Sequence, residues 1–143
     1  MQVWARGVLV TLLLASFPGV AQNMPAPEGV ELSIIWPPDG EVIQGGKLWV
    51  RMGLEGMGIA PAGINMEGTG HHHFLIDTDL PPLDEPIPSD RHHIHFGAGQ
   101  TEARLTGLAP GEHTLQLMLG DHEHFPHDPP VVSEKITITV LPY

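Results

Sequence analysis

The sequence predicts an all-β protein, an immunoglobulin-like antiparallel β-sandwich of about seven strands. Apolar residues recur in short runs with a two-residue alternation, which is typical of strands with one buried face. The 17 Gly and 15 Pro residues of the 143-residue chain separate these runs and form no low-complexity tract. No segment keeps a 3.6-residue period over three turns. Short strands separated by turn signals favour a sandwich.

The predicted strands follow one another at short intervals. They span residues 31–36, 47–54, 71–78, 92–96, 101–105, 112–119 and 131–140. Residues 37–40, Pro-Pro-Asp-Gly, form a turn that closes the first strand, and Pro110-Gly111 forms another before the sixth. In the second strand the alternating apolar residues are Leu48, Val50, Met52 and Leu54. Long connections at 55–70, 79–91 and 120–130 are unusual in a compact domain and favour a functional role for these loops.

The N-terminus has the pattern of a secretory signal peptide over residues 1–21. Arg6 precedes an apolar run at 7–17, and Gly19-Val20-Ala21 is a small-x-small cleavage site. The run is shorter than the roughly 20 residues of a membrane span. We therefore expect cleavage, a flexible segment at 22–30, a β-sandwich domain at 31–143, and a periplasmic or secreted protein with no membrane span after signal cleavage.

Charge and cysteine content restrict the partners. The formal net charge is −11 at pH 7, which argues against nucleic acid and anionic lipid surfaces because both attract Lys and Arg. The chain has no cysteine, so it has no disulfide and no thiolate ligand or nucleophile. A bound metal would be held by His, carboxylate, Met or backbone oxygen.

Nine of the ten histidines form three clusters, and His113 stands alone. The clusters are His71–His73, then His92, His93 and His95, then His122, His124 and His127. Residues i and i+2 of a strand share a face and lie about 6.6 Å apart. His71 and His73 therefore share one face, His93 and His95 share another, and each pair could clamp one ion. If the two strands are neighbours, four imidazoles face each other.

The remaining histidines fall into two groups. His72 lies on the face of Phe74 and Ile76, and His92 on that of Ile94 and Phe96. We predict structural roles for both. We do not expect His113 to be a metal ligand. The third cluster lies in a loop stiffened by prolines, where His124 and His127 are second-choice ligands.

Two methionines, Met57 and Met66, could donate thioether sulfur to Cu(I), although such residues more often fill gaps in a core.

The predicted function is an exported binding protein that holds a divalent transition metal through histidines. Imidazole-rich sites suit Cu or Zn, and the sequence does not separate them. The predicted ligands are His71, His73, His93, His95, His124 and His127. There are two alternatives. The first is a loop-based protein- or glycan-binding module without metal, whose partner could be an exported protein. The second is a metal-dependent hydrolase. No nucleophile or general-base motif is visible, so the sequence favours a binding protein over an enzyme.

The region from about residue 53 to 140 resembles a bacterial exported domain family of unknown function. The resemblance rests on Gly-His-His-His before Leu-Ile-Asp, on His-x-His-Phe-Gly before Gly-Gln-Thr-Glu, and on the Pro-Gly-Glu-His-Thr-Leu turn. The matching positions are His71, His72, His73, Asp77, His93, His95, Gly97, Gln100, Thr101, Glu102, His113, His124 and His127. The resemblance implies an exported β-rich domain and supplies no activity. His113 belongs to its pattern, and His122 is variable in it.

Overall fold

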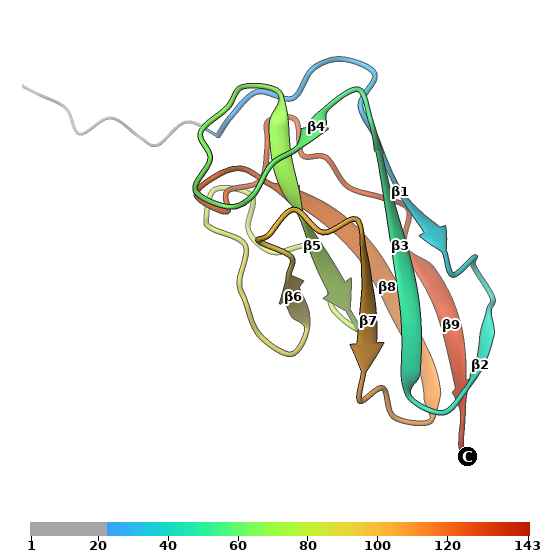
Figure 1. The fold of residues 1–143 in the computed structure, drawn as a ribbon. Coiled ribbons are helices and arrows are strands. Elements are labelled where there is room, and N and C mark those ends of the chain that lie inside the picture. Colours follow the sequence, from blue (N-terminus) through green and yellow to red (C-terminus); the bar gives the residue numbers. More distant parts are fainter. Residues whose placement is uncertain (1–22) are drawn as a thin grey trace, which may run out of the picture.

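A computed structural model describes residues 23–143, and the predicted signal peptide lies outside this range (Figure 1). The described residues form nine β-strands and no helix. The strands are β1 (Glu31–Trp36), β2 (Val42–Gln44), β3 (Lys47–Glu55), β4 (Gly58–Ile59), β5 (Thr69–Ile76), β6 (His93–His95), β7 (Glu102–Thr106), β8 (Gly111–Gly120) and β9 (Ile136–Leu141). In this part of the chain, then, no helix is long and apolar enough to cross a membrane.

The strands make two sheets with immunoglobulin-like order. The smaller sheet has the order β1-β3-β7, and the larger has β2-β9-β8-β5, with β4 and β6 each pairing β5. The sequence of strands β1, β3, β5, β7, β8 and β9 thus corresponds to A, B, C, E, F and G of an immunoglobulin domain, with A, B and E in one sheet and C, F and G in the other. Among the nine described strands, β2–β9 and β4–β5 are the pairs that run in parallel. The predicted fold class is confirmed.

All seven predicted strands are present, and two further strands were not predicted. β2 and β4 have three and two residues, too few to show an alternating pattern. β9 begins at Ile136 instead of residue 131. The residues before it make single contacts with β8: Val132 bridges Met118, and the Ser133 N–H donates to the Leu117 carbonyl at 3.0 Å.

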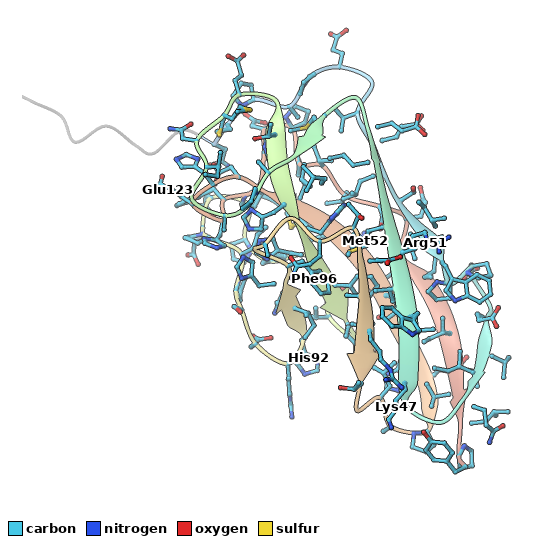
Figure 2. The ribbon with its side chains drawn as sticks, in the orientation of Figure 1. Lys47, Arg51, Met52, His92, Phe96 and Glu123 are labelled. Carbon is cyan, nitrogen blue, oxygen red and sulfur yellow. The ribbon has the colours of Figure 1, made fainter. Side chains whose placement is uncertain are left out.

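The main core lies between the two sheets. Its buried members include Leu48, Val50 and Met52 from β3 and Leu115 and Leu117 from β8, whose side chains alternate inward. Figure 2 labels Met52 and Phe96, which enter this core from opposite sheets. This core holds the two sheets together, and it leaves the outer face of the larger sheet to be covered by loops.

Strand β5 is buried on both faces, which the sequence did not indicate. Phe74 and Ile76 enter the main core, as parity predicts, while Leu75 packs on the other face with Ile87 and Met118. Ile87 comes from the 77–92 loop, which crosses the outer face of the sheet. The face of β5 that carries His71 and His73 is therefore an interior surface.

The segment before β1 is attached to the 121–130 loop. The Ala26 N–H donates to the Asp128 carbonyl at 3.0 Å, and the Asp128 N–H donates to the Met24 carbonyl at 2.9 Å. This pairing joins residues that are about a hundred positions apart in the sequence. It anchors one end of the histidine-bearing loop to the N-terminal segment of the domain.

Candidate metal centre

Strand pairing brings the two predicted His-x-His pairs together. β5 and β6 are antiparallel neighbours, with His73 opposite His95 and Leu75 opposite His93. The two histidine-bearing strands are therefore neighbours, which the sequence analysis could state only as a condition. Side chains that lie directly opposite each other on one face have Cβ atoms about 5 Å apart. The register therefore places the His73 and His95 rings in contact.

Four imidazole rings meet on the outer face of the larger sheet. They belong to His71, His73, His95 and His124, and their ring centroids lie between 4.7 and 5.8 Å apart in all six pairs. The Nε2 atoms of His71 and His73 are 3.0 Å apart, and those of His95 and His124 are 3.2 Å apart. We call these four residues the histidine cluster.

A turn in the 121–130 loop delivers His124 to the cluster. His124 has a φ of 72°, a left-handed conformation that is uncommon for residues other than glycine. The buried Asp121 stabilises the turn, because its Oδ1 accepts the N–H of Glu123 at 2.8 Å and of Phe125 at 3.0 Å. The Ile87 N–H donates to the His124 carbonyl at 2.8 Å. Figure 2 labels Glu123, the neighbour of His124, on this loop.

Burial keeps the inner rings of the cluster neutral. His71 and His73 are fully buried, and desolvation together with the neighbouring His95 lowers the pKa of His71 to about 4. Desolvation and then His71 lower the pKa of His73 to about 2. Desolvation, followed by His124, also lowers the pKa of His95. Neutral imidazole is the form that ligates metal ions.

Three glycines give the rings their space, and the sequence did not point to this role. A Cβ at Gly120 would lie 2.8 Å from His73 Nε2, and one at Gly97 would lie 2.2 Å from His95 Cε1. A Cβ at Gly70 would lie 2.7 Å from the Gly120 carbonyl oxygen and 2.9 Å from Cε1 of His127, which is outside the cluster. Gly70 and Gly97 belong to the Gly-His-His-His and His-x-His-Phe-Gly motifs, but the motifs did not indicate this role. Gly120 belongs to no such motif, and its role follows from strand pairing.

The geometry of the cluster could hold a metal ion. One ligand nitrogen from each of His71, His73 and His95 lies within 4.8 Å of the others. Nitrogens about 2.0 Å from one ion lie about 3.3 Å apart in a tetrahedral site and about 2.8 Å apart in a square-planar one. The two observed Nε2 separations, 3.0 and 3.2 Å, fall between these values.

Packing orients the two inner rings. Among the described residues, the Nδ1 atoms of His71 and His73 have no hydrogen-bond partner. Metal-bound histidines commonly donate the other ring N–H to a carboxylate or carbonyl. In this cluster the position of the rings depends on the glycines and on the loop contacts instead.

Two predicted ligands have other partners. His93 Nδ1 lies 2.9 Å from Asp90 Oδ1, and His127 Nε2 lies 3.2 Å from the Thr69 carbonyl, to which it donates. His127 is buried, and its Nδ1 has no partner among the described residues. The structure thus brings four of the six predicted ligands together in the histidine cluster. The role of all six residues as metal ligands stays a prediction.

The other histidines contact backbone or carboxylate groups. His72 Nδ1 donates to the Gln100 carbonyl at 3.0 Å, and desolvation lowers the pKa of His72. His92 Nδ1 donates to the Ile76 carbonyl at 2.8 Å. His113 contacts Asp77, and His122 Nε2 lies 4.0 Å from Glu123 Oε2. These contacts agree with the structural roles predicted for His72 and His92.

The fold and the site together define an immunoglobulin-like β-sandwich with a histidine cluster that could hold a metal ion. The chain belongs to the family described as Domain of unknown function (DUF4399), whose model matches residues 50–141. No curated protein matches. The solution structure of the PKD domain from human KIAA0319 is similar, with 13% identity over 90% of this chain and 92% of that chain and a TM-score of 0.42.

Proposed function

We propose that this protein is an exported binding protein that holds one divalent transition metal ion, Cu or Zn, in the histidine cluster. One observation carries the proposal: two pairs of Nε2 atoms, 3.0 and 3.2 Å apart, belong to four rings that are in mutual contact. Four imidazoles without thiolate suit Cu and Zn. The proposed ligands are His71, His73 and His95, with His124 as the fourth.

The charge and the burial of the cluster support sequestration or transfer of the ion. The chain is strongly acidic, with a formal charge of −11, and an acidic surface attracts cations. His71 and His73 are fully buried, whereas His95 and His124 are partly exposed. An ion would therefore reach the inner pair past the outer pair. We place the protein in the periplasm or outside the cell, as the signal-peptide pattern predicts.

The experiment is metal analysis of the untagged protein, because a histidine tag would itself bind metal. Protein purified without chelator is analysed for transition metals, and metal-free protein is titrated with Zn(II) and Cu(II). We expect one equivalent of one metal to bind tightly. Less than one-tenth equivalent after purification, together with no uptake on titration, would refute the proposal.

A second candidate function, glycan binding, is favoured by the two tryptophans of the described chain. Trp36 and Trp49 are 45% and 60% exposed, and with Ile35, also exposed, they line a cavity of about 450 Å³ on the smaller sheet. Arg51 and Glu102 lie at its edge, 3.9 Å apart. Indoles combine a broad apolar face with an N–H donor, and the charged pair offers groups for hydroxyls.

This candidate predicts binding that is independent of metal. The measurement is a glycan-array screen of the untagged protein with and without chelator, repeated with Trp49→Ala. Glycans retained in chelator and lost in the variant would favour the second function. Binding abolished by chelator would instead point to the histidine cluster.

A further inference from the structure

A second cavity lies at the open edge of the sandwich, on the other side of β6 from the metal centre. It has a volume of about 630 Å³ and is lined by residues of β5, β6, β7 and β8 and of the loops next to them. Its apolar lining includes Ile76, Ile94, Leu105 and Leu108. Figure 2 labels His92, which borders this cavity and lies just before the start of β6. The volume is within the range of small-molecule sites, about 300–1,000 Å³.

Two arginines of this acidic protein line the cavity. Arg6 lies outside the described range, so five of the six Lys and Arg residues are described. Arg51 and Lys135 pair with carboxylates. The other three basic residues in 23–143 have no carboxylate within 4.0 Å. Two of these three, Arg91 and Arg104, line this cavity. In a chain with a formal charge of −11, this placement makes a local positive site.

His92 positions the Arg91 guanidinium. Since His92 Nδ1 donates to the Ile76 carbonyl at 2.8 Å, its Nε2 carries a lone pair, and this accepts the Arg91 Nε–H at 3.0 Å. The Nη groups of Arg91 keep their donors, and a guanidinium held in this way presents a fork that matches a carboxylate or a phosphate.

His113 offers a third positive charge when it is protonated. Its Nδ1 lies 2.6 Å from Asp77 Oδ2 and its Nε2 lies 2.8 Å from the Ala109 carbonyl. Both partners are acceptors, so these contacts favour the imidazolium, which donates from both ring nitrogens. Asp77 is also engaged by the Thr114 N–H, which donates to Oδ1 at 2.9 Å. Arg91 and Arg104 outnumber the one carboxylate of the lining, Asp77, so the cavity has a net positive charge, which a protonated His113 increases.

We propose that this cavity binds a small organic anion, with a carboxylate or phosphate head held by Arg91 and Arg104 and an apolar body packed against Leu105 and Ile94. The proposal concerns a site separate from the metal centre, and neither depends on the other. The apolar lining and the paired guanidinium groups are the two features that such a ligand requires.

The experiment is an NMR titration of the full-length, untagged, chelator-treated protein with hexanoate, hexyl phosphate and the neutral hexanamide. We expect the two anions to shift the signals of Ile94, Leu105 and the Arg side chains. Hexanamide should bind about tenfold more weakly or worse, because it lacks the charge-assisted hydrogen bonds. The anion that binds more tightly identifies the head group.

Three variants test the assignment. Arg91→Gln and Arg104→Gln should each weaken anion binding about tenfold or more. Arg51→Gln removes the same charge from the other cavity and should leave binding unchanged. The proposal is overturned if hexanamide binds as well as the anions, if neither anion binds, or if Arg51→Gln weakens binding as much as the other two.

Discussion

His71 Nε2 and His73 Nε2 lie 3.0 Å apart in a fully buried environment, on one face of strand β5. In the absence of metal, the Nε2–H of one neutral ring donates to the Nε2 lone pair of the other. The Nδ1 atoms of both rings have no partner among residues 23–143, and burying polar groups without partners costs free energy. A metal ion that ligates both Nε2 atoms would replace this single hydrogen bond with two bonds to the ion.

The neighbouring residues His72 and His73 should separate metal binding from stability. His73→Ala removes a ring of the cluster, so we expect the bound metal to fall well below one equivalent. His72→Ala removes a ring that bonds the Gln100 carbonyl on the opposite face, and should cost about 1–3 kcal/mol of unfolding free energy with one equivalent still bound. Metal titration and urea denaturation measure the two effects. Equal metal loss in both variants would contradict the assignment.

The cluster should also discriminate between histidines of the same predicted pair. His95→Ala should weaken metal binding, because the His95 ring contacts all three other rings. His93→Ala should leave it nearly unchanged, because His93 contacts Asp90. The measurement is competition with a chromophoric chelator. A larger loss for His93→Ala than for His95→Ala would show that the ligand set is different.

Glycine substitutions probe the space around the rings without removing a ligand. Gly120→Ala would place a Cβ 2.8 Å from His73 Nε2, so the ring must move and metal affinity should fall. Gly58→Ala is the matched control, because its Cβ would lie 3.4 Å from Thr69 Cγ2, an ordinary contact. Metal affinity and circular dichroism are measured for both. Unchanged affinity in folded Gly120→Ala would show that the His73 ring is not fixed as described.

The metal-free protein should lose stability in acid. The pKa values of His71 and His73 are lowered to about 4 and about 2 in the folded state, against about 6.5 in the unfolded chain. The unfolded state therefore binds more protons below pH 6.5, and stability is lost as pH falls from there toward the folded values. Each ring contributes up to about 1.4 kcal/mol per pH unit.

Urea denaturation between pH 7 and pH 4.5, in chelator, measures this slope. The double variant His71→Leu, His73→Leu should show a shallower slope, because two titrating groups are removed. If the slope is the same in the double variant, the acid sensitivity arises from other groups.

His113 should show the opposite dependence. Desolvation lowers its pKa, but the Ala109 carbonyl and the Asp77 carboxylate outweigh this effect, and the pKa is raised. Its stabilising contribution is complete below the unfolded value of about 6.5 and is lost as pH rises through the folded pKa. An NMR titration should show His113 with a pKa above the unfolded value of about 6.5, and Asp77→Asn should lower its pKa. An unchanged pKa in Asp77→Asn would exclude the ion pair as a cause.

Much of this fold followed from local pattern. The two-residue alternation identified seven of the nine described strands, and parity placed Phe74 and Ile76 in the main core and His71 and His73 on the other face. The three-residue strand β6 was found because its alternation continues over residues 92–96. Strands β2 and β4, with three and two residues, lie in segments without such an alternation. These features depend on residues within a few positions of one another, which is why the sequence shows them.

The assembly of the site depends on contacts that are distant in the sequence. The sequence did not show whether β5 and β6 pair. It also does not indicate the left-handed turn at His124. The burial of His71 and His73 results from the loops that cover the sheet, including Ile87. The role of Gly120 likewise appears only when β8 lies next to β5.

The most direct test of the metal centre is X-ray absorption spectroscopy of protein loaded with one equivalent of Zn(II) or Cu(II). The account predicts three or four nitrogen ligands about 2.0 Å from the metal, with the outer-shell scattering of imidazole, and the loss of this signal in His73→Ala. A shell of oxygen ligands without imidazole scattering, or a spectrum that does not change in His73→Ala, would contradict it.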